Sequence, residues 1–96
     1  MKTINRGWLK RKIQKGLVQA RVDGYYTDDY SWDSAANFGR TGWLPARIRP
    51  EGENQLPDGF IYFNPSDFRG YGHAWRDANG NIALTFGYRD YTLRGI

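Results

Sequence analysis

The chain has 96 residues, of which 40% are hydrophobic, 17% are aromatic and 25% are charged, and its formal net charge is +4. This length and composition predict one globular domain, residues 1–96, and exclude both a disordered chain and a fold with two cores. The absence of cysteine excludes disulfides and thiolate metal sites, and no apolar run is long enough to span a membrane. We therefore expect a cytoplasmic protein.

The charges are unevenly distributed along the chain. Residues 1–22 carry seven cations and no acid, whereas residues 23–39 carry four aspartates and no base. All four lysines lie within the first fifteen residues, so every later cation is an arginine. An asymmetry of this kind indicates that one end of the molecule meets a polyanion or an acidic protein surface.

The first predicted element is a short helix over residues 4–15. Apolar residues recur there at intervals of four, and Gly16 follows where a C-terminal cap is expected. The pattern then changes to strict alternation over residues 18–22, which is typical of a half-buried strand.

Two further strands are predicted in the middle of the chain. Residues 43–49 alternate with their even-numbered side chains inward, and Pro45 predicts that this strand lies at a sheet edge. Residues 50–59 form a turn-rich loop. Residues 60–63 are apolar on both faces, which predicts a central strand.

The C-terminal third predicts a β-hairpin whose last strand, residues 82–93, is interrupted near its end. Asn79-Gly80 is the strongest two-residue turn signal, because both turn residues require positive φ. Pairing outward from that turn places Trp75 opposite Leu84, with every apolar partner on one face. A bulged turn, which would pair Trp75 with Ala83, is the less favoured alternative.

The acidic stretch TDDYSWDSAANFG, residues 27–39, allows several interpretations. In the structural interpretation, Asp28 or Asp29 caps a short helical insert near residues 29–37, which Gly39 ends. A Mg²⁺ or Ca²⁺ site, a glycosidase-like carboxylate pair and a partner-facing acidic patch are the alternatives. The spacing of the aspartates matches no Ca²⁺ loop, so the structural interpretation is favoured and we expect neither metal nor cofactor.

The sequence contains no catalytic signature. His73 is the only histidine, which excludes a histidine pair for zinc. Its predicted position between Tyr71 and Trp75, opposite Phe86, indicates a packed side chain rather than a general base. Residues 77–81 resemble the start of a Ca²⁺ loop but lack its distant glutamate. We therefore expect a protein that is not an enzyme.

Basic residues beside aromatic rings form the candidate binding site. Arg47 and Arg49 project from one face of the predicted edge strand, and Trp43 points the same way. Such arginines can hold phosphates and stack on bases, although charged outer faces also keep small sheets soluble. The predicted partner-binding residues are Lys10, Arg11, Lys15, Trp43, Arg47 and Arg49.

The first half of the chain, through MKTINRGWLKRKI and YYTDDYSWDSAANFGRTGWLPARI, resembles small accessory proteins of enterobacterial plasmids and phages. The resemblance implies a cytoplasmic, non-enzymatic protein of a mobile element. Such proteins often inhibit host defence or nucleic-acid machinery, and they include anti-CRISPR and anti-restriction proteins. Many nuclease inhibitors of that kind are acidic DNA mimics, whereas this chain is basic, so simple DNA mimicry is disfavoured.

These patterns together predict an α+β fold in which an N-terminal helix packs on a four- or five-stranded antiparallel sheet, with a short helical insert. The expected function is a non-enzymatic binding protein that inhibits or modulates a host protein or ribonucleoprotein machine, such as a CRISPR or restriction defence complex. The alternative is a direct, weakly sequence-selective DNA- or RNA-binding protein. The aromatic residues expected in the core are Trp8, Phe60, Tyr62, Trp75, Phe86 and Tyr88.

Overall fold

The computed structural model describes residues 3–27, 31–34 and 42–96. The elements within these ranges are α1 (Arg6–Gln14), β1 (Gln19–Tyr26), β2 (Trp32–Ser34), β3 (Leu44–Ile48), β4 (Ile61–Phe63), the 3₁₀ helix η2 (Pro65–Phe68), β5 (His73–Arg76), β6 (Ile82–Phe86) and β7 (Arg89–Arg94). The α+β class and the N-terminal helix are confirmed. The sheet formed by the described residues, however, has seven strands rather than four or five.

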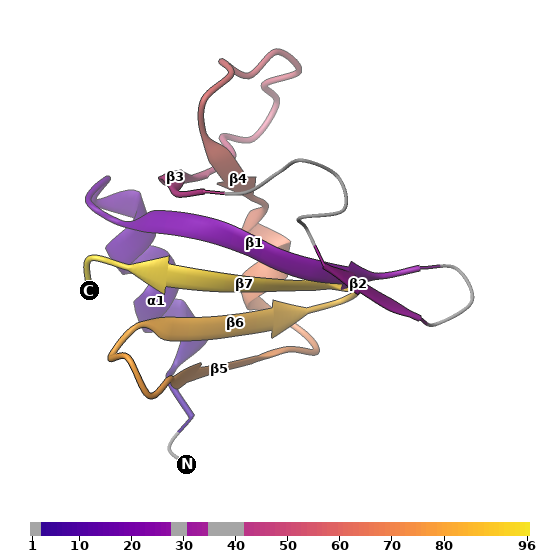
Figure 1. Ribbon diagram of the computed structural model, residues 1–96. Helices are drawn as coiled ribbons and strands as arrows, with labels where there is room; N and C mark the ends of the chain where they lie inside the picture. The colour runs from indigo at the N-terminus through magenta and orange to yellow at the C-terminus, as the bar shows by residue number, and fades with distance from the viewer. Residues whose placement is uncertain (1–2, 28–30, 35–41) are drawn as a thin grey trace.

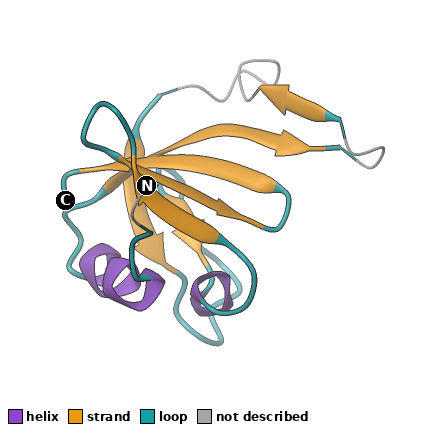
Figure 2. Ribbon diagram, turned by 90° about the horizontal axis from the view of Figure 1, so that it is seen from below, coloured by secondary structure: helices purple, strands orange, loops and turns teal. Residues whose placement is uncertain are grey.

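The strands form one sheet of order β4-β3-β1-β7-β6-β5, and β2 pairs with β1 outside this path. Neighbouring strands are antiparallel except β3 and β4, which are parallel. In Figure 1, α1 lies behind β7 and β6. Figure 2 shows α1 and η2 on the same side of the sheet. One face is therefore covered by helices, and no helix among the described residues covers the other.

The hydrophobic core lies between α1 and the face of the sheet that α1 covers. Leu9 and Ile13 of α1 are fully buried and pack with the inward residues of the strands. Phe63 is the central aromatic residue, because its ring centroid lies 4.9 Å from that of Tyr91 and 5.8 Å from that of Phe68. The inward residues of β1, β6 and β7 in this core are Ala20, Ile82, Leu84, Tyr91 and Leu93.

The aromatic residues predicted for the core are only partly in it. Trp8 and Phe86 pack against the buried cluster, but Tyr88 is 63% exposed. Phe60, Tyr62 and Trp75 lie outside the cluster. These corrections follow from strand registers, which the sequence pattern left open.

The helix α1 begins and ends where local signals place it. The side-chain oxygen of Asn5 accepts the backbone N–H of Trp8 at 2.9 Å, so the helix starts after this cap rather than at residue 4. Gly16 adopts a φ of 83° and donates its N–H to the carbonyl of Ile13. A left-handed glycine at this position satisfies the last carbonyls of the helix.

The strand β3 is an interior strand, so the edge position predicted from Pro45 is wrong. It pairs with β1 on one side and with β4 on the other. Pro45 is tolerated because Ala46 donates the hydrogen bond to Val18, at 2.9 Å, and pairing with β4 begins only at Ala46. Leu44, expected inward, is 41% exposed. The predicted central strand at residues 60–63 is instead β4, at the edge of the sheet.

The hairpin of β5 and β6 has the register that the sequence disfavoured, with Trp75 opposite Ala83. The turn is one residue longer than predicted, because the Asp77 carboxylate accepts two of its backbone N–H groups, each at 2.9 Å. Gly80 supplies the left-handed residue, with a φ of 79°. Such longer loops are the next most common hairpin connection. The shift places Trp75 and His73 on the uncovered face.

Two other sequence predictions are corrected at β2 and β7. Residues 32–34 form a strand paired with β1, where a helical insert was predicted; Asp28, Asp29 and Gly39 lie outside the described residues. Residues 89–94 form a separate strand that folds back antiparallel to β6 rather than extending it.

Candidate binding interface

The uncovered side of the sheet presents outward side chains from four neighbouring strands, and we call it the open face. The strand register aligns these side chains in rows, one of which runs from Trp75 on β5 to Arg21 on β1. The residues that these four strands contribute to the open face are Gln19, Arg21, Asp23, His73, Trp75, Ala83, Thr85, Asp90, Thr92 and Arg94.

A hydrogen-bonded network fixes the centre of the open face. Arg21 and Asp23 are two residues apart on β1, so their side chains lie on the same side of the sheet, and Arg21 donates to Asp23 there. One Asp23 oxygen accepts from Arg21 Nε at 2.9 Å, and the other accepts from the Thr92 hydroxyl at 2.5 Å. Because the Arg21 side chain is 42% exposed, this ion pair contributes at most about 1 kcal/mol. Its main effect is to orient the guanidinium.

Two guanidinium groups lie over the ring of Trp43. The Cζ atom of Arg94 is 4.1 Å from the ring centroid and that of Arg21 is 4.8 Å from it. Arg94 is held further by its Nε, which donates to Gln19 at 2.8 Å. Each such contact contributes about 0.5–1 kcal/mol at an exposed site. Trp43 therefore belongs to the open face and holds two cations beside one another.

More cations lie at one corner of the molecule. Three segments meet there: the connection between α1 and β1, the strand β3 and the end of β7. Arg47 donates to the carbonyl of Gly16 at 3.3 Å, which places its guanidinium beside the end of α1. The end of β7 lies against the same connection, since a Cβ on Gly95 would be 2.8 Å from the Leu17 carbonyl. We call Lys15, Arg47 and Arg94 the basic corner. None of the three forms a salt bridge with any described residue.

Exposed aromatic rings lie at the opposite end of β1. Trp32 is 48% exposed and Tyr88 is 63% exposed. Tyr26 pairs with Trp32 across the strands, and its N–H donates to the Tyr88 carbonyl at 2.7 Å. The indole N–H of Trp32 donates to Asp90 at 3.1 Å. This bond fixes Trp32 against the edge of the open face.

The six predicted partner-binding residues do not form one surface. Lys10 and Arg11 lie on α1, on the helix-covered side (Figure 2), whereas Trp43 lies on the open face. Lys15 and Arg47 lie at the corner between the two sides. No sequence pattern indicated Arg21 and Arg94, because only the pairing of β1 with β7 brings them beside Trp43.

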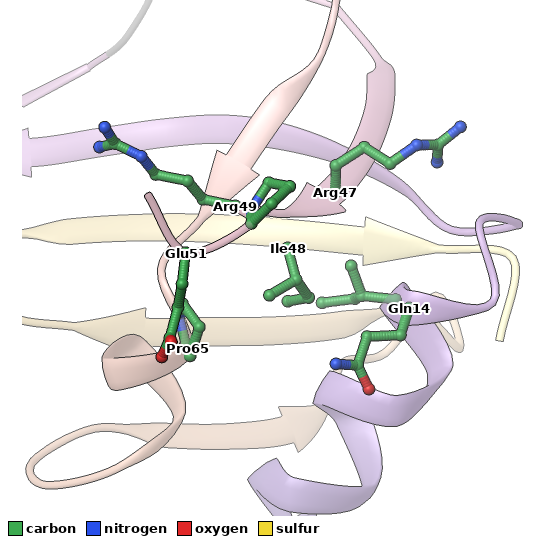
Figure 3. A pocket seen from close by; sticks show the side chains of 8 residues that line it. Gln14, Arg47, Ile48, Arg49, Glu51 and Pro65 are labelled. Carbon is green, nitrogen blue, oxygen red and sulfur yellow. The ribbon is translucent and has the colours of Figure 1, made fainter. Parts of the chain in front are cut away.

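Arg47 and Arg49 border a cleft of about 320 Å³ between the end of α1, β3 and Pro65. Ile48 lies in the middle of the cleft, and the two arginine side chains extend away from it in opposite directions (Figure 3). Arg49 donates instead to the backbone of Glu53 at 3.1 Å. Because the guanidinium groups diverge, they do not form a joint anion site in this cleft.

His73 and Asp33, two of the groups considered for chemistry, lie on different strands, β5 and β2. His73 is exposed at the start of β5, so its predicted packed position is wrong. Across residues 3–27, 31–34 and 42–96, no three His, Asp or Glu side chains are close enough to share a metal ion. Burial and the Asp33 carboxylate raise the pKa of Tyr25, and a hydrogen bond to Tyr91 raises the pKa of Arg89. The open face offers cations, hydroxyl groups and rings, which are suited to binding.

Comparisons with protein-family models, curated proteins and solved structures found no match to this chain. In the part of the chain that the structure describes, no helix has the length and hydrophobicity needed to cross a lipid bilayer.

Proposed function

We propose that this chain is a non-enzymatic binding protein that inhibits or modulates a host protein or ribonucleoprotein machine, such as a CRISPR or restriction defence complex. The observation that carries the proposal is the open face, where Arg21 and Arg94 lie over Trp43 on a sheet surface that no described helix covers. The resemblance of the first half of the chain to accessory proteins of mobile elements supports a host partner.

The composition of the open face is that of a binding hot spot. Tryptophan, tyrosine and arginine dominate the energetics of protein interfaces. Here Trp43 is held by two guanidinium groups and Trp32 by Asp90, so their positions are largely set before a partner arrives. Side chains that are already ordered lose less conformational entropy on association. The cations of the basic corner favour a partner with an acidic or phosphate-lined surface.

A pull-down from an enterobacterial lysate, with and without nuclease, tests this proposal. We expect the wild-type chain to retain a host component in stoichiometric amount. The Arg94→Glu variant should lose it, because charge reversal opposes an anionic partner. Arg69→Glu is the matched control, since Arg69 follows η2 on the helix-covered side. Absence of a stoichiometric partner, or equal retention by the two variants, would contradict the proposal.

A direct DNA- or RNA-binding protein is the second candidate function. The observation that favours it is the same pair of guanidinium groups on Trp43, since arginines beside aromatic rings bind both phosphates and bases. A gel shift at about 50 mM salt, with affinity that falls as salt rises, is the expected result. Failure to shift any nucleic acid at that salt concentration would eliminate this candidate.

A further inference from the structure

We infer that the open face binds single-stranded nucleic acid, with phosphate groups at the basic corner and unpaired bases against the rings of the face. The inference rests on the proposed function and names the part of the partner that is contacted. That part is an exposed strand of RNA or DNA within the host complex.

The distribution of charge favours phosphates at one end of the open face. Lys15, Arg47 and Arg94 gather at the basic corner without a salt bridge to any described residue. The carboxylates of Asp23 and Asp90 lie farther along the face and accept hydrogen bonds from groups of the face itself. Attraction for a phosphodiester backbone is therefore greatest at the corner, where the cations are not offset.

Arg94 has the geometry of a phosphate ligand. Its Nε donates to Gln19 at 2.8 Å, and its guanidinium lies over Trp43 at 4.1 Å. Within residues 3–27, 31–34 and 42–96, no other group bonds the two terminal nitrogens, which can therefore face an incoming oxyanion. The planar guanidinium matches two phosphate oxygens at once. Because these contacts already hold the guanidinium plane, less side-chain entropy is lost when a phosphate binds.

The rest of the open face suits flat, unpaired bases. The row that joins Trp75 to Arg21 passes over the small side chains of Ala83 and Thr92, and it crosses three strand spacings, about 14 Å in all. Rings on an uncovered sheet stack on bases whose faces are free. Bases within a duplex are already stacked on one another, so the layout favours a single strand.

An acidic protein segment is the competing partner for the same cations. Its carboxylates would pair with Arg94 and Arg47, but the carboxylate groups themselves do not stack on the rings placed along the face. Nucleic acid uses both features, because every nucleotide of the strand carries both a phosphate and a base. The combination of Trp43 with two guanidinium groups therefore favours nucleic acid.

Fluorescence anisotropy with a fluorescein-labelled oligothymidylate of about 12 nucleotides, at about 50 mM salt, tests this inference. We expect binding by the full chain that weakens as salt rises. Trp43→Leu and Arg94→Gln should each weaken it at least about fivefold, the lower end for loss of one stacking or cationic contact. Arg69→Gln, which removes the same charge on the helix-covered side, should change affinity less than about twofold.

One further variant and two further ligands make the outcome decisive. Arg94→Lys keeps the charge but loses the planar group, so it should lie between wild type and Arg94→Gln. A duplex of the same length and a glutamate peptide of the same charge should both bind more weakly than the oligothymidylate. Arg94 is exposed, so its replacement leaves the fold intact and carries the test if Trp43→Leu unfolds.

Specific results would overturn the inference. The inference is wrong if the chain binds the glutamate peptide as tightly as the oligothymidylate, or if it does not bind oligothymidylate. It is also wrong if Arg94→Gln and Arg69→Gln change the affinity equally. If the pull-down then still retains a protein partner after nuclease treatment, the proposed function stands and only the nucleic-acid contact is wrong. If neither experiment finds a partner, both are wrong.

Discussion

Replacing Gly24 by alanine should displace Trp32 from the edge of the open face. Gly24 is buried on β1 beneath the Trp32 ring, and its φ is not in the left-handed region. An added Cβ would lie 2.3 Å from one ring carbon of Trp32 and 2.7 Å from the carbonyl oxygen of Asp33. Carbon atoms in contact normally lie about 3.5–4.0 Å apart, so the shortfall exceeds about 1 Å.

The expected loss of stability follows from which groups must move to make room for the added Cβ. Rotation of Trp32 relieves the ring contact but breaks its bond to Asp90, and the Asp33 oxygen remains because it belongs to the backbone of β2. Overpacking of this kind costs about 1–3 kcal/mol, and the lower chain entropy of alanine offsets about 0.4–1 kcal/mol. We expect a net loss of about 1–2 kcal/mol in the free energy of unfolding, or about 4–16 °C in Tm.

Urea denaturation followed by far-UV circular dichroism measures the stability, and the indole N–H resonance of Trp32 reports its position. Gly7→Ala is the control. Its Cβ meets only side-chain atoms, the nearer being Asn5 Oδ1 at 3.1 Å, and alanine gains helix propensity at this position. If Gly24→Ala is as stable as wild type and the Trp32 resonance is unchanged, the packing of β2 on β1 described here is wrong.

Three further predictions concern the core, the central network and the response to pH. Leu9→Ala should lower the free energy of unfolding, measured by urea titration, by about 2–5 kcal/mol, because Leu9 is fully buried. Leu17 is the control: its side chain is 79% exposed, so Leu17→Ala should change the same free energy by less than about 0.5 kcal/mol. Thr92→Val should lower the free energy of unfolding by about 1 kcal/mol, because it removes the hydroxyl that donates to Asp23. Thermal melting measures the change, and an unchanged Tm would refute the network of Arg21, Asp23 and Thr92. Burial and the Asp33 carboxylate raise the pKa of the Tyr25 hydroxyl above 10.0 in the folded state. As pH rises, the unfolded chain therefore loses the hydroxyl proton before the folded chain does. The contribution of Tyr25 to folding stability is complete below pH 10.0 and is lost as pH rises through the folded-state pKa. Tyr25→Phe should therefore flatten the fall in stability above about pH 10, and an identical fall in the variant would contradict the assignment.

Local signals in the sequence were sufficient for the elements that depend on neighbouring residues. Asn5 and Gly16 mark the ends of α1 through their own hydrogen bonds and backbone conformation. The alternation of apolar residues identified the strands β1 and β6, because every second side chain enters the core. These features also sufficed to predict the α+β class.

Registers and strand order required information from distant residues. The side chain of Asp77 lengthens the turn and reverses the faces of Trp75 and His73, which the Asn-Gly pair alone did not indicate. The strand β2 forms by pairing with β1, and its Trp32 donates to Asp90, which lies 58 residues away. A helix pattern at those residues cannot reveal such a partner.

The candidate binding site also depends on contacts between residues that are distant in the sequence. Trp43 was identified from its neighbours Arg47 and Arg49, but the cations that contact its ring are Arg21 and Arg94. Those two arginines meet because β1 and β7 pair antiparallel along most of their length. The basic N-terminal segment was evident from composition, whereas its division between α1 and the basic corner depends on the fold.

Chemical-shift mapping of the ¹⁵N-labelled chain during titration with oligothymidylate tests most directly which surface makes the contact. We expect the Trp43 indole and the amides of Arg21, Thr92 and Arg94 to shift together and to saturate with one dissociation constant. If the shifts are confined to Lys10, Arg11 and the rest of α1, with the sheet resonances unmoved, the open face is not the binding surface.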